Sequence, residues 1–385
     1  MDHERSTQPA FACRSDPSAP IAGGHRVLAL CYGCTVVLSG RSRMHEIPWV
    51  LLVSGLLCTG SAMGCIPASL TLDTPGDASD PDAPCSGKCP KALATNQDAP
   101  LDVVTDGTRV YWTTAVSVMS CAVGGCEKQP TTLATAQAMP MGIAVSGQYL
   151  YWTSTIGGQV MACDVEACNL SPSTLVEQQG APRGIGAGAS ALFWANSSTG
   201  QVMACANGLS CTPKGVAVTQ NKPWATATVG TVALWINQGT SAAQSDGEVI
   251  NCDYATDSTC IPKVVASGQP MPVAIAVDAS RVYWANQGAG TDTGQVLSHA
   301  IAPDATPPTV LADNQASPAS LALDSTRVYW TNSKSGEVMA CELAGCNKQP
   351  TVIASGQTKP WGVAVDEHSV YWTDLGHGRV YKIAK

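Results

Sequence analysis

Residues 369–374 read SVYWTD, and the aromatic dipeptide at their centre decides the fold of this chain. Six similar dipeptides precede it, and successive tryptophans are 40, 42, 41, 49, 46 and 42 residues apart. A repeat of about 40–45 residues is typical of one four-stranded blade of a β-propeller. The seven dipeptides are Tyr111-Trp112, Tyr151-Trp152, Phe193-Trp194, Leu234-Trp235, Tyr283-Trp284, Tyr329-Trp330 and Tyr371-Trp372.

Each repeat predicts four short antiparallel strands. An apolar run such as GVAV (362–365) forms the first strand, and the dipeptide lies in the second. A Gly-x-Val step opens the third strand, and a run such as TVIAS (351–355) forms the fourth. Alternating apolar residues bounded by Gly, Asn, Ser and Pro are typical of half-buried strands. We therefore expect an all-β fold, a propeller of seven four-stranded blades over residues 90–385; six or eight blades fit the repeat less well.

The two ends of this region predict how the ring closes. After the seventh dipeptide the chain supplies a third strand, GRVYKIAK (378–385), without a fourth. Before the first dipeptide, PKALAT (90–95) is a fourth strand without a blade of its own. We expect this N-terminal strand to complete the seventh blade, because closure removes exposed strand edges.

The repeat resembles the YWTD-type propellers of receptor ectodomains and bacterial secreted proteins, over roughly residues 90–385. Tyr371-Trp372-Thr373-Asp374 matches the whole tetrapeptide of that family. NHL-type and virginiamycin-lyase-like propellers are similar as well. Propeller lyases and lactonases hold a metal at the channel mouth through acidic residues, Asn or His, so the resemblance keeps an enzyme among the alternatives.

Residues 48–65 predict export and a lipid anchor. The apolar run 49–57 is too short to span a bilayer but fits the core of a signal peptide, although a buried hydrophobic helix is the alternative. The small residues before Cys65 resemble a bacterial lipobox. We expect a leader or a mis-called start over 1–43, a signal peptide over 44–64, a lipidated Cys65 with a flexible tether over 65–89, and the propeller over 90–385.

These segments predict an exported bacterial lipoprotein. Ile66 follows the cysteine in place of the Asp that typically retains lipoproteins at an inner membrane, so we expect the outer membrane or the cell surface. Contact with the membrane is expected through the lipid anchor only.

The cysteines follow the same plan. Four of the 17 precede the proposed cleavage point, Cys65 would carry the lipid, and twelve remain. They form six local couples between a third and a fourth strand, which predicts six disulfides in an exported protein. Zinc is the alternative, but it would require two couples from different blades to converge. The couples are Cys85/Cys89, Cys121/Cys126, Cys163/Cys168, Cys205/Cys211, Cys252/Cys260 and Cys341/Cys346.

Composition and motifs narrow the function classes. The net charge of −8 and the absence of a basic cluster argue against a nucleic-acid partner. No nucleophile elbow, zinc-protease helix or phosphate-binding loop occurs, so we expect no catalytic residue, metal or cofactor. The recurring aspartates are expected to serve turns, and the histidines of the mature chain to lie in surface loops without partners. These residues are Asp106, Asp278, Asp324, Asp366, His299, His368 and His377.

The link from each fourth strand to the next first strand contains Gln-x-x-Pro. The seven glutamines, each expected to satisfy backbone groups between blades, are Gln97, Gln137, Gln179, Gln220, Gln269, Gln315 and Gln357. The residue after the proline varies and should ring one mouth of the central channel. Either these side chains bind a ligand there or they plug the channel. Our candidate ligand-binding residues are Trp224, Trp361, Arg183, Met141 and Leu101.

The turns between second and third strands should lie on the same face. Two of these turns are long, at 237–247 and 286–294. They either form an asymmetric recognition edge or are surface insertions that the fold tolerates. We therefore expect a monomeric, lipid-anchored propeller that binds or scaffolds a glycan, peptide or protein partner. The alternative is a propeller enzyme of the lyase or lactonase type with a divalent metal at the channel mouth.

Overall fold

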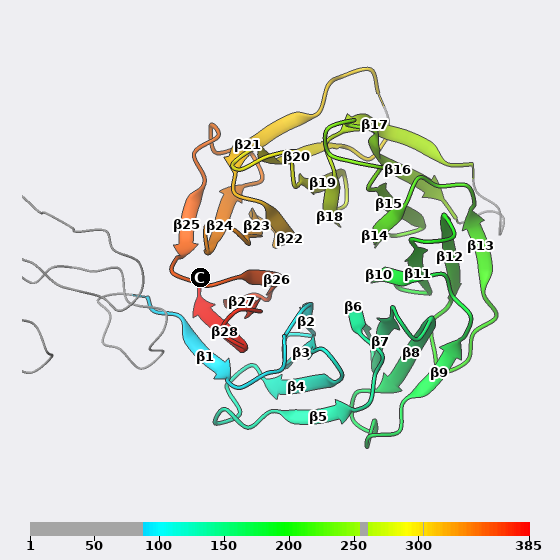
Figure 1. The fold of residues 1–385 in the computed structure, drawn as a ribbon, viewed down its shortest axis with the longest axis vertical. Helices are drawn as coiled ribbons and strands as arrows, with labels where there is room; N and C mark the ends of the chain where they lie inside the picture. The colour runs from blue at the N-terminus through cyan, green and yellow to red at the C-terminus, as the bar shows by residue number, and fades with distance from the viewer. Residues whose placement is uncertain (1–87, 255–260, 303) are drawn as a thin grey trace, which may run out of the picture. The chain divides into compact units, whose positions relative to one another are not determined.

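The computed structural model describes residues 88–254, 261–302 and 304–385 as a ring of seven four-stranded antiparallel sheets (Figure 1). All secondary-structure elements of this part are strands. The predicted all-β fold and the count of seven blades are confirmed.

The strands of each blade run outward from the centre of the ring in chain order, except that the outermost strand of the seventh blade comes from the N-terminal end of the described chain (Figure 1). The innermost strands are β2 (Val103–Thr105), β6 (Pro140–Ser146), β10 (Pro182–Ala187), β14 (Pro223–Val229), β18 (Pro272–Val277), β22 (Pro318–Leu323) and β26 (Pro360–Val365). The second strands are β3 (Arg109–Thr113), β7 (Tyr149–Ser154), β11 (Ala191–Asn196), β15 (Val232–Asn237), β19 (Arg281–Asn286), β23 (Arg327–Asn332) and β27 (Ser369–Asp374). The third strands are β4 (Val118–Ala122), β8 (Gln159–Asp164), β12 (Gln201–Ala206), β16 (Gly247–Asp253), β20 (Gly294–Ala300), β24 (Glu337–Glu342) and β28 (Arg379–Ala384). The outermost strands are β5 (Thr131–Ala134), β9 (Ser173–Val176), β13 (Lys214–Ala217), β17 (Lys263–Gln269), β21 (Thr309–Gln315), β25 (Thr351–Ala354) and β1 (Lys91–Ala94).

The N-terminal strand closes the ring as expected. Strand β1 pairs antiparallel with β28, with Lys91 opposite Lys382 and Ala92 opposite Tyr381. The seventh blade therefore combines the two ends of the described chain, and its β28 is not left as an open edge.

The aromatic dipeptides build the interfaces between blades. Neighbouring residues of a strand point to opposite faces of the sheet, so Tyr and Trp of one dipeptide contact different blades. Trp330 packs in one core with Tyr283 of the preceding blade, while Tyr329 packs with Trp372 of the next. The tryptophans of all seven dipeptides are fully buried. The tryptophan is therefore constant, and the residue before it is always a large apolar or aromatic one, because each copy contributes to two interfaces.

The glutamine of each link joins the outer strand of one blade to the indole of the next. Each Gln Oε1 accepts a hydrogen bond from the Trp Nε1 fifteen residues later, at 2.8–3.0 Å in all seven copies. Each Nε2 donates to the carbonyl oxygen two residues earlier. The predicted structural role is confirmed, and the indole is a partner that we did not predict.

The glycine that precedes or opens a third strand lies against the next link. Gly158 has a φ of 61°, and a Cβ on it would lie 2.8 Å from the carbonyl oxygen of Gln179. Gly378 has the same φ and would meet Gln97 at 2.6 Å. Glycine alone combines a left-handed backbone with so close an approach.

Four of the predicted disulfides are present, each between a third and a fourth strand: Cys121–Cys126, Cys163–Cys168, Cys205–Cys211 and Cys341–Cys346. Cys89 and Cys252 are also disulfide-bonded, while their predicted partners Cys85 and Cys260 lie outside the described residues. For the four complete pairs the zinc alternative is wrong.

The disulfides indicate an extracytoplasmic location, because such bonds persist in oxidising compartments. The predicted leader, signal peptide and Cys65 lie outside the described residues. Within the described ranges, no helix has the length and apolar character needed to cross a membrane.

Candidate functional site at the channel mouth

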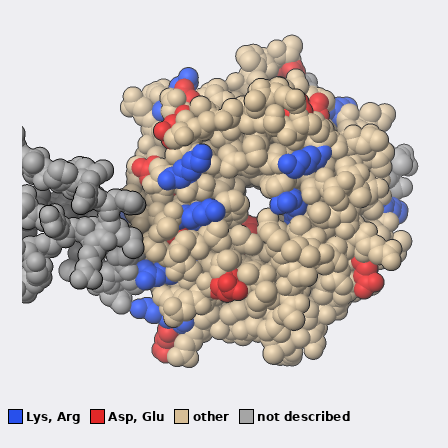
Figure 2. All heavy atoms as spheres, viewed as in Figure 1, with Lys and Arg blue, Asp and Glu red and all other residues tan. Residues whose placement is uncertain are grey.

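The links and the turns between second and third strands lie on one face of the ring, as predicted. Backbone hydrogen bonds join them: the Ala115 N–H donates to the Asp98 carbonyl, and the Ile156 N–H to that of Ala138. A central cavity of about 540 Å³ is lined by the innermost strands. Figure 2 shows the opening at the centre of this face. We call this opening the mouth.

All five candidate residues line this one cavity: Leu101, Met141, Arg183, Trp224 and Trp361. Each directly follows the proline of its link. The next residue along faces the neighbouring blade, as Gly142 shows, because a Cβ there would lie 2.5 Å from the Arg183 carbonyl oxygen. The mouth remains open in Figure 2, so these side chains do not plug the channel.

Arg183 and Trp224 stack on each other across two adjacent blades. The guanidinium carbon lies 3.8 Å from the centre of the indole ring. Nε of Arg183 donates to Ser197 Oγ at 3.3 Å. Burial lowers the pKa of Arg183 below its usual value. One face of Trp224 is therefore covered by the arginine.

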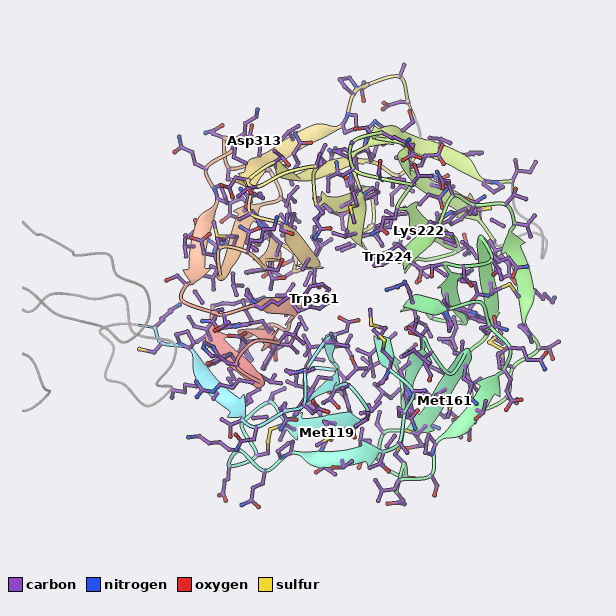
Figure 3. All side chains as sticks on the ribbon, in the orientation of Figure 1. Met119, Met161, Lys222, Trp224, Asp313 and Trp361 are labelled. Atoms are coloured by element: carbon purple, nitrogen blue, oxygen red, sulfur yellow. A yellow bond between two sulfur atoms is a disulfide. The ribbon has the colours of Figure 1, made fainter. Side chains whose placement is uncertain are left out.

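Two lysines at the mouth escaped the sequence analysis. Lys222 Nζ lies 5.3 Å from the ring centre of Trp224, and Lys359 Nζ lies 5.5 Å from that of Trp361. Figure 2 shows Lys and Arg side chains around the opening, and Figure 3 places Trp361 across it from Trp224 and Lys222. Both lysines directly precede a link proline, so a comparison of both neighbours of each proline would have found them.

The residue before the proline has a left-handed backbone in six of the seven links, Lys359 being the exception. Lys222 has a left-handed φ of 60°, in a region that non-glycine residues rarely adopt. Five further links share this conformation, at Ala99, Met139, Ala181, Met271 and Ser317. In these six links the chain therefore turns sharply at the residue before the proline.

A glutamine from each long turn also lines the cavity. Gln238 is 2% exposed, and its Oε1 has no hydrogen-bond partner among the described residues. Its backbone N–H donates to the Lys222 carbonyl at 3.0 Å, which places it beside the Lys222–Trp224 segment. Gln287, from the next blade, donates through Nε2 to Ser317 Oγ at 2.8 Å. The long turns therefore supply polar groups to the channel wall.

Asp102 is a carboxylate in the channel wall. Its Oδ1 accepts from the Val103 N–H at 3.0 Å and its Oδ2 from the Ile143 N–H at 3.2 Å. Burial raises its pKa to about 6, although these hydrogen bonds oppose the shift. It joins the innermost strands of two adjacent blades, at a position that is Gly, Ala or Ser in the other six.

The seventh blade carries a hydrogen-bonded chain of three side chains on the mouth face. Asp374 is fully buried, and its Oδ2 lies 2.7 Å from His377 Nδ1. His377 Nε2 lies 2.6 Å from Thr358 Oγ1. Since an ionised carboxylate can only accept, Nδ1 donates to Asp374, and Nε2 accepts from the threonine hydroxyl when the ring is neutral and donates to it when the ring is charged.

This chain corrects our expectation for the histidines. His377 has partners, and His299 lies buried on β20, with its ring nitrogens 2.9 Å from the carbonyls of Ala300 and Thr306. Only His368 is the exposed loop residue that we expected. The repeat pattern could not predict the partners of His377, because His377 and Thr358 each occur in one repeat only.

The recurring aspartates serve turns, as predicted. In each, one carboxylate oxygen accepts the N–H groups two and three residues later, and the other accepts a Tyr hydroxyl. These residues are Asp106, Asp278, Asp324 and Asp366. In the described ranges, no three His, Cys, Asp or Glu side chains are grouped so that they could hold a metal ion.

Fold and mouth together define a seven-bladed β-propeller with a cationic and aromatic channel opening. No family model and no curated protein matches the chain. Solved structures do match, among them a streptogramin B lyase with 9% identity, a TM-score of 0.61, and coverage of 77% of this chain and 97% of that one.

Two further matches differ in what they do. Virginiamycin B lyase from Staphylococcus aureus has 14% identity and a TM-score of 0.61, over 78% of this chain and 100% of that one. A chain of a nidogen/laminin complex has 15% identity and a TM-score of 0.51, over 69% and 97%. At such identities the likeness shows the fold alone, and this fold serves both enzymes and protein-binding modules.

Proposed function

We propose that this protein is an extracytoplasmic binding module whose ligand, a glycan, a peptide or a segment of a protein, occupies the mouth of the channel. One observation carries the proposal: the mouth is asymmetric on a symmetric scaffold. The link Gln and Pro are the same in all seven repeats, whereas the residues on either side of the proline differ from blade to blade. Variation confined to one ring of a constant framework is typical of a binding site on a fold.

Binding of purified full-length protein to glycan and peptide arrays tests this proposal. We expect Trp361→Ala and Arg183→Ala each to weaken binding, because both side chains line the cavity. Lys263→Ala is the matched control, since Lys263 is exposed on the outermost strand β17. Wild-type binding by both mouth variants would exclude the mouth as the site.

The lipid anchor is part of the same proposal. A diacylated Cys65 would hold the propeller at the outer membrane or the cell surface, with the propeller itself as a monomer. Mass spectrometry of the mature protein tests this. We expect an N-terminal lipidated Cys65 in the wild type and a soluble, unlipidated product for Cys65→Ser. An unlipidated wild-type N-terminus would contradict it.

A second candidate function is an enzyme. The chain of Asp374, His377 and Thr358 supports it, because a histidine oriented by a carboxylate and hydrogen-bonded to a hydroxyl can activate that hydroxyl as a nucleophile. A lyase or lactonase with a divalent metal at the mouth is the other form of this candidate. Turnover of ester and lactone substrates separates them: His377→Gln would abolish the first activity, and a chelator the second.

A further inference from the structure

We propose that the mouth recognises an acidic sugar, a uronic acid unit of a glycan, with Arg183 binding its carboxylate. The inference rests on the proposed function, that a ligand binds at the mouth, and it names the chemistry of that ligand. It rests on three cations without ion-pair partners, on a guanidinium oriented by an indole, on a glutamine in the cavity lining, and on a second indole across the opening.

The charge of the mouth is opposite to that of the protein. The whole chain carries a net charge of −8, yet the residues flanking the seven link prolines include three cations, against the one carboxylate of Asp102 in the lining of the cavity. In the part of the chain that the structure describes, none of the three forms an ion pair. A local field of this sign attracts anions to the opening. The three cations are Arg183, Lys222 and Lys359.

Arg183 has the geometry to bind a carboxylate with two hydrogen bonds. Its contact with the face of Trp224, at 3.8 Å, fixes the plane of the guanidinium. Nε of Arg183 donates to Ser197 Oγ, and the two terminal nitrogens of the guanidinium have no hydrogen-bond partner in the described residues. A half-buried cation without an anion is costly, and a planar carboxylate matches the free edge of the guanidinium. Lys222, beside the same indole, adds a second positive charge.

The remaining groups favour a sugar over other carboxylates. Gln238 lines the same cavity, and a side-chain amide forms hydrogen bonds with sugar hydroxyls. Trp361, across the opening, offers an indole for the apolar C–H face of a sugar ring (Figure 3). The cavity of about 540 Å³ is within the size range of small-ligand sites. A uronic acid combines a carboxylate, hydroxyl donors and a C–H face in one small unit.

Calorimetric titration of the full-length protein tests this with four probes. They are a uronic acid oligosaccharide, its neutral methyl ester, a neutral glucose oligosaccharide, and an oligoglutamate peptide. We expect the uronate to bind most tightly and to weaken as sodium chloride is raised, because salt screens the cations. Arg183→Gln should weaken it about 10- to 100-fold, as expected for loss of a charged hydrogen-bonding partner.

Variants that fold like the wild type keep the test decisive. Arg183→Lys retains the charge but loses the paired donors, so it should restore part of the affinity. Lys263→Ala, on the outer strand, should change nothing. Thermal unfolding checks that each variant is folded, and Arg183 is partly exposed, so its replacement should leave Tm close to that of the wild type.

The outcomes separate this inference from the proposed function. Equal binding of the uronate and its methyl ester, or unchanged uronate binding by Arg183→Gln, would overturn the acidic-sugar inference. Binding of the peptide or the neutral sugar that depends on Trp361 but not on Arg183 would overturn it too, while leaving the mouth as a binding site. Failure of all four probes to bind at millimolar concentration would also overturn it. The glycan and peptide arrays would still test independently whether the mouth is a binding site.

Discussion

Replacing Gln315 by Met should destabilise the propeller by removing one acceptor from two buried donors. Gln315 Oε1 accepts from Trp330 Nε1 at 2.9 Å and from Asn332 Nδ2 at 3.0 Å, and all three residues are buried. Met is also unbranched, with a similar length, so packing changes little. A buried donor left without a partner costs about 1–3 kcal/mol, so Gln315→Met should lower the free energy of unfolding by about 2–6 kcal/mol.

Gln137 provides the matched comparison. Its Oε1 accepts from Trp152 Nε1 at 2.9 Å, and the Asn of the other blade is replaced by Ser154, which donates elsewhere. Gln137 is also only half-buried, so water reaches its surroundings. Gln137→Met therefore leaves one donor without an acceptor and should cost about 1–3 kcal/mol, half of the loss expected for Gln315→Met.

Equilibrium unfolding in urea, followed by both circular dichroism and fluorescence, measures the two losses. The double variant Gln315→Met with Trp330→Phe should cost less than the sum of its single variants, because phenylalanine has no N–H to leave unpaired. Equal losses for Gln315→Met and Gln137→Met, or a loss below about 0.5 kcal/mol for Gln315→Met, would refute the reasoning.

Three further predictions test other features. Burial raises the pKa of Asp102 to about 6, so the folded state holds the proton longer than the unfolded chain, and stability should fall as pH rises from 4 through 6. Asp102→Asn should remove up to about 3 kcal/mol of this dependence, and an unchanged pH profile of Tm would contradict it. Replacing Cys341 and Cys346 by Ser should cost about 2 kcal/mol in urea unfolding, a difference that must vanish under reducing conditions. Gly378→Ala should cost more than Gly107→Ala, because both have left-handed φ but only Gly378 would also place its Cβ against another residue.

The fold could be read from the sequence because each blade repeats the same contacts with its neighbours. Tyr329 and Trp330 recur at a constant place in the repeat, since each copy fills the same two interfaces. The bond between Gln315 and Trp330 could not be read in this way. It depends on the path of the link, which brings the glutamine back to an indole fifteen residues ahead, and periodicity carries no information about that path.

The site was predicted only in part. Arg183 and Trp361 were found because they vary at a constant position, but the variable position before the proline was missed. Lys222 reaches the mouth through a left-handed backbone, which is rare for lysine and has no sequence marker here. His377 was missed for a different reason: its partners Asp374 and Thr358 meet it only through the packing of a turn against a link.

The pairing of β1 with β28 also constrains the order of folding. Lys91 finds Lys382 only after all the intervening blades exist, so the ring cannot close on an incomplete chain during synthesis. Contacts of such large sequence separation form slowly, because loop closure must precede them. Until β28 has been made, β1 has no strand to pair with, so closure of the ring is a late event in folding.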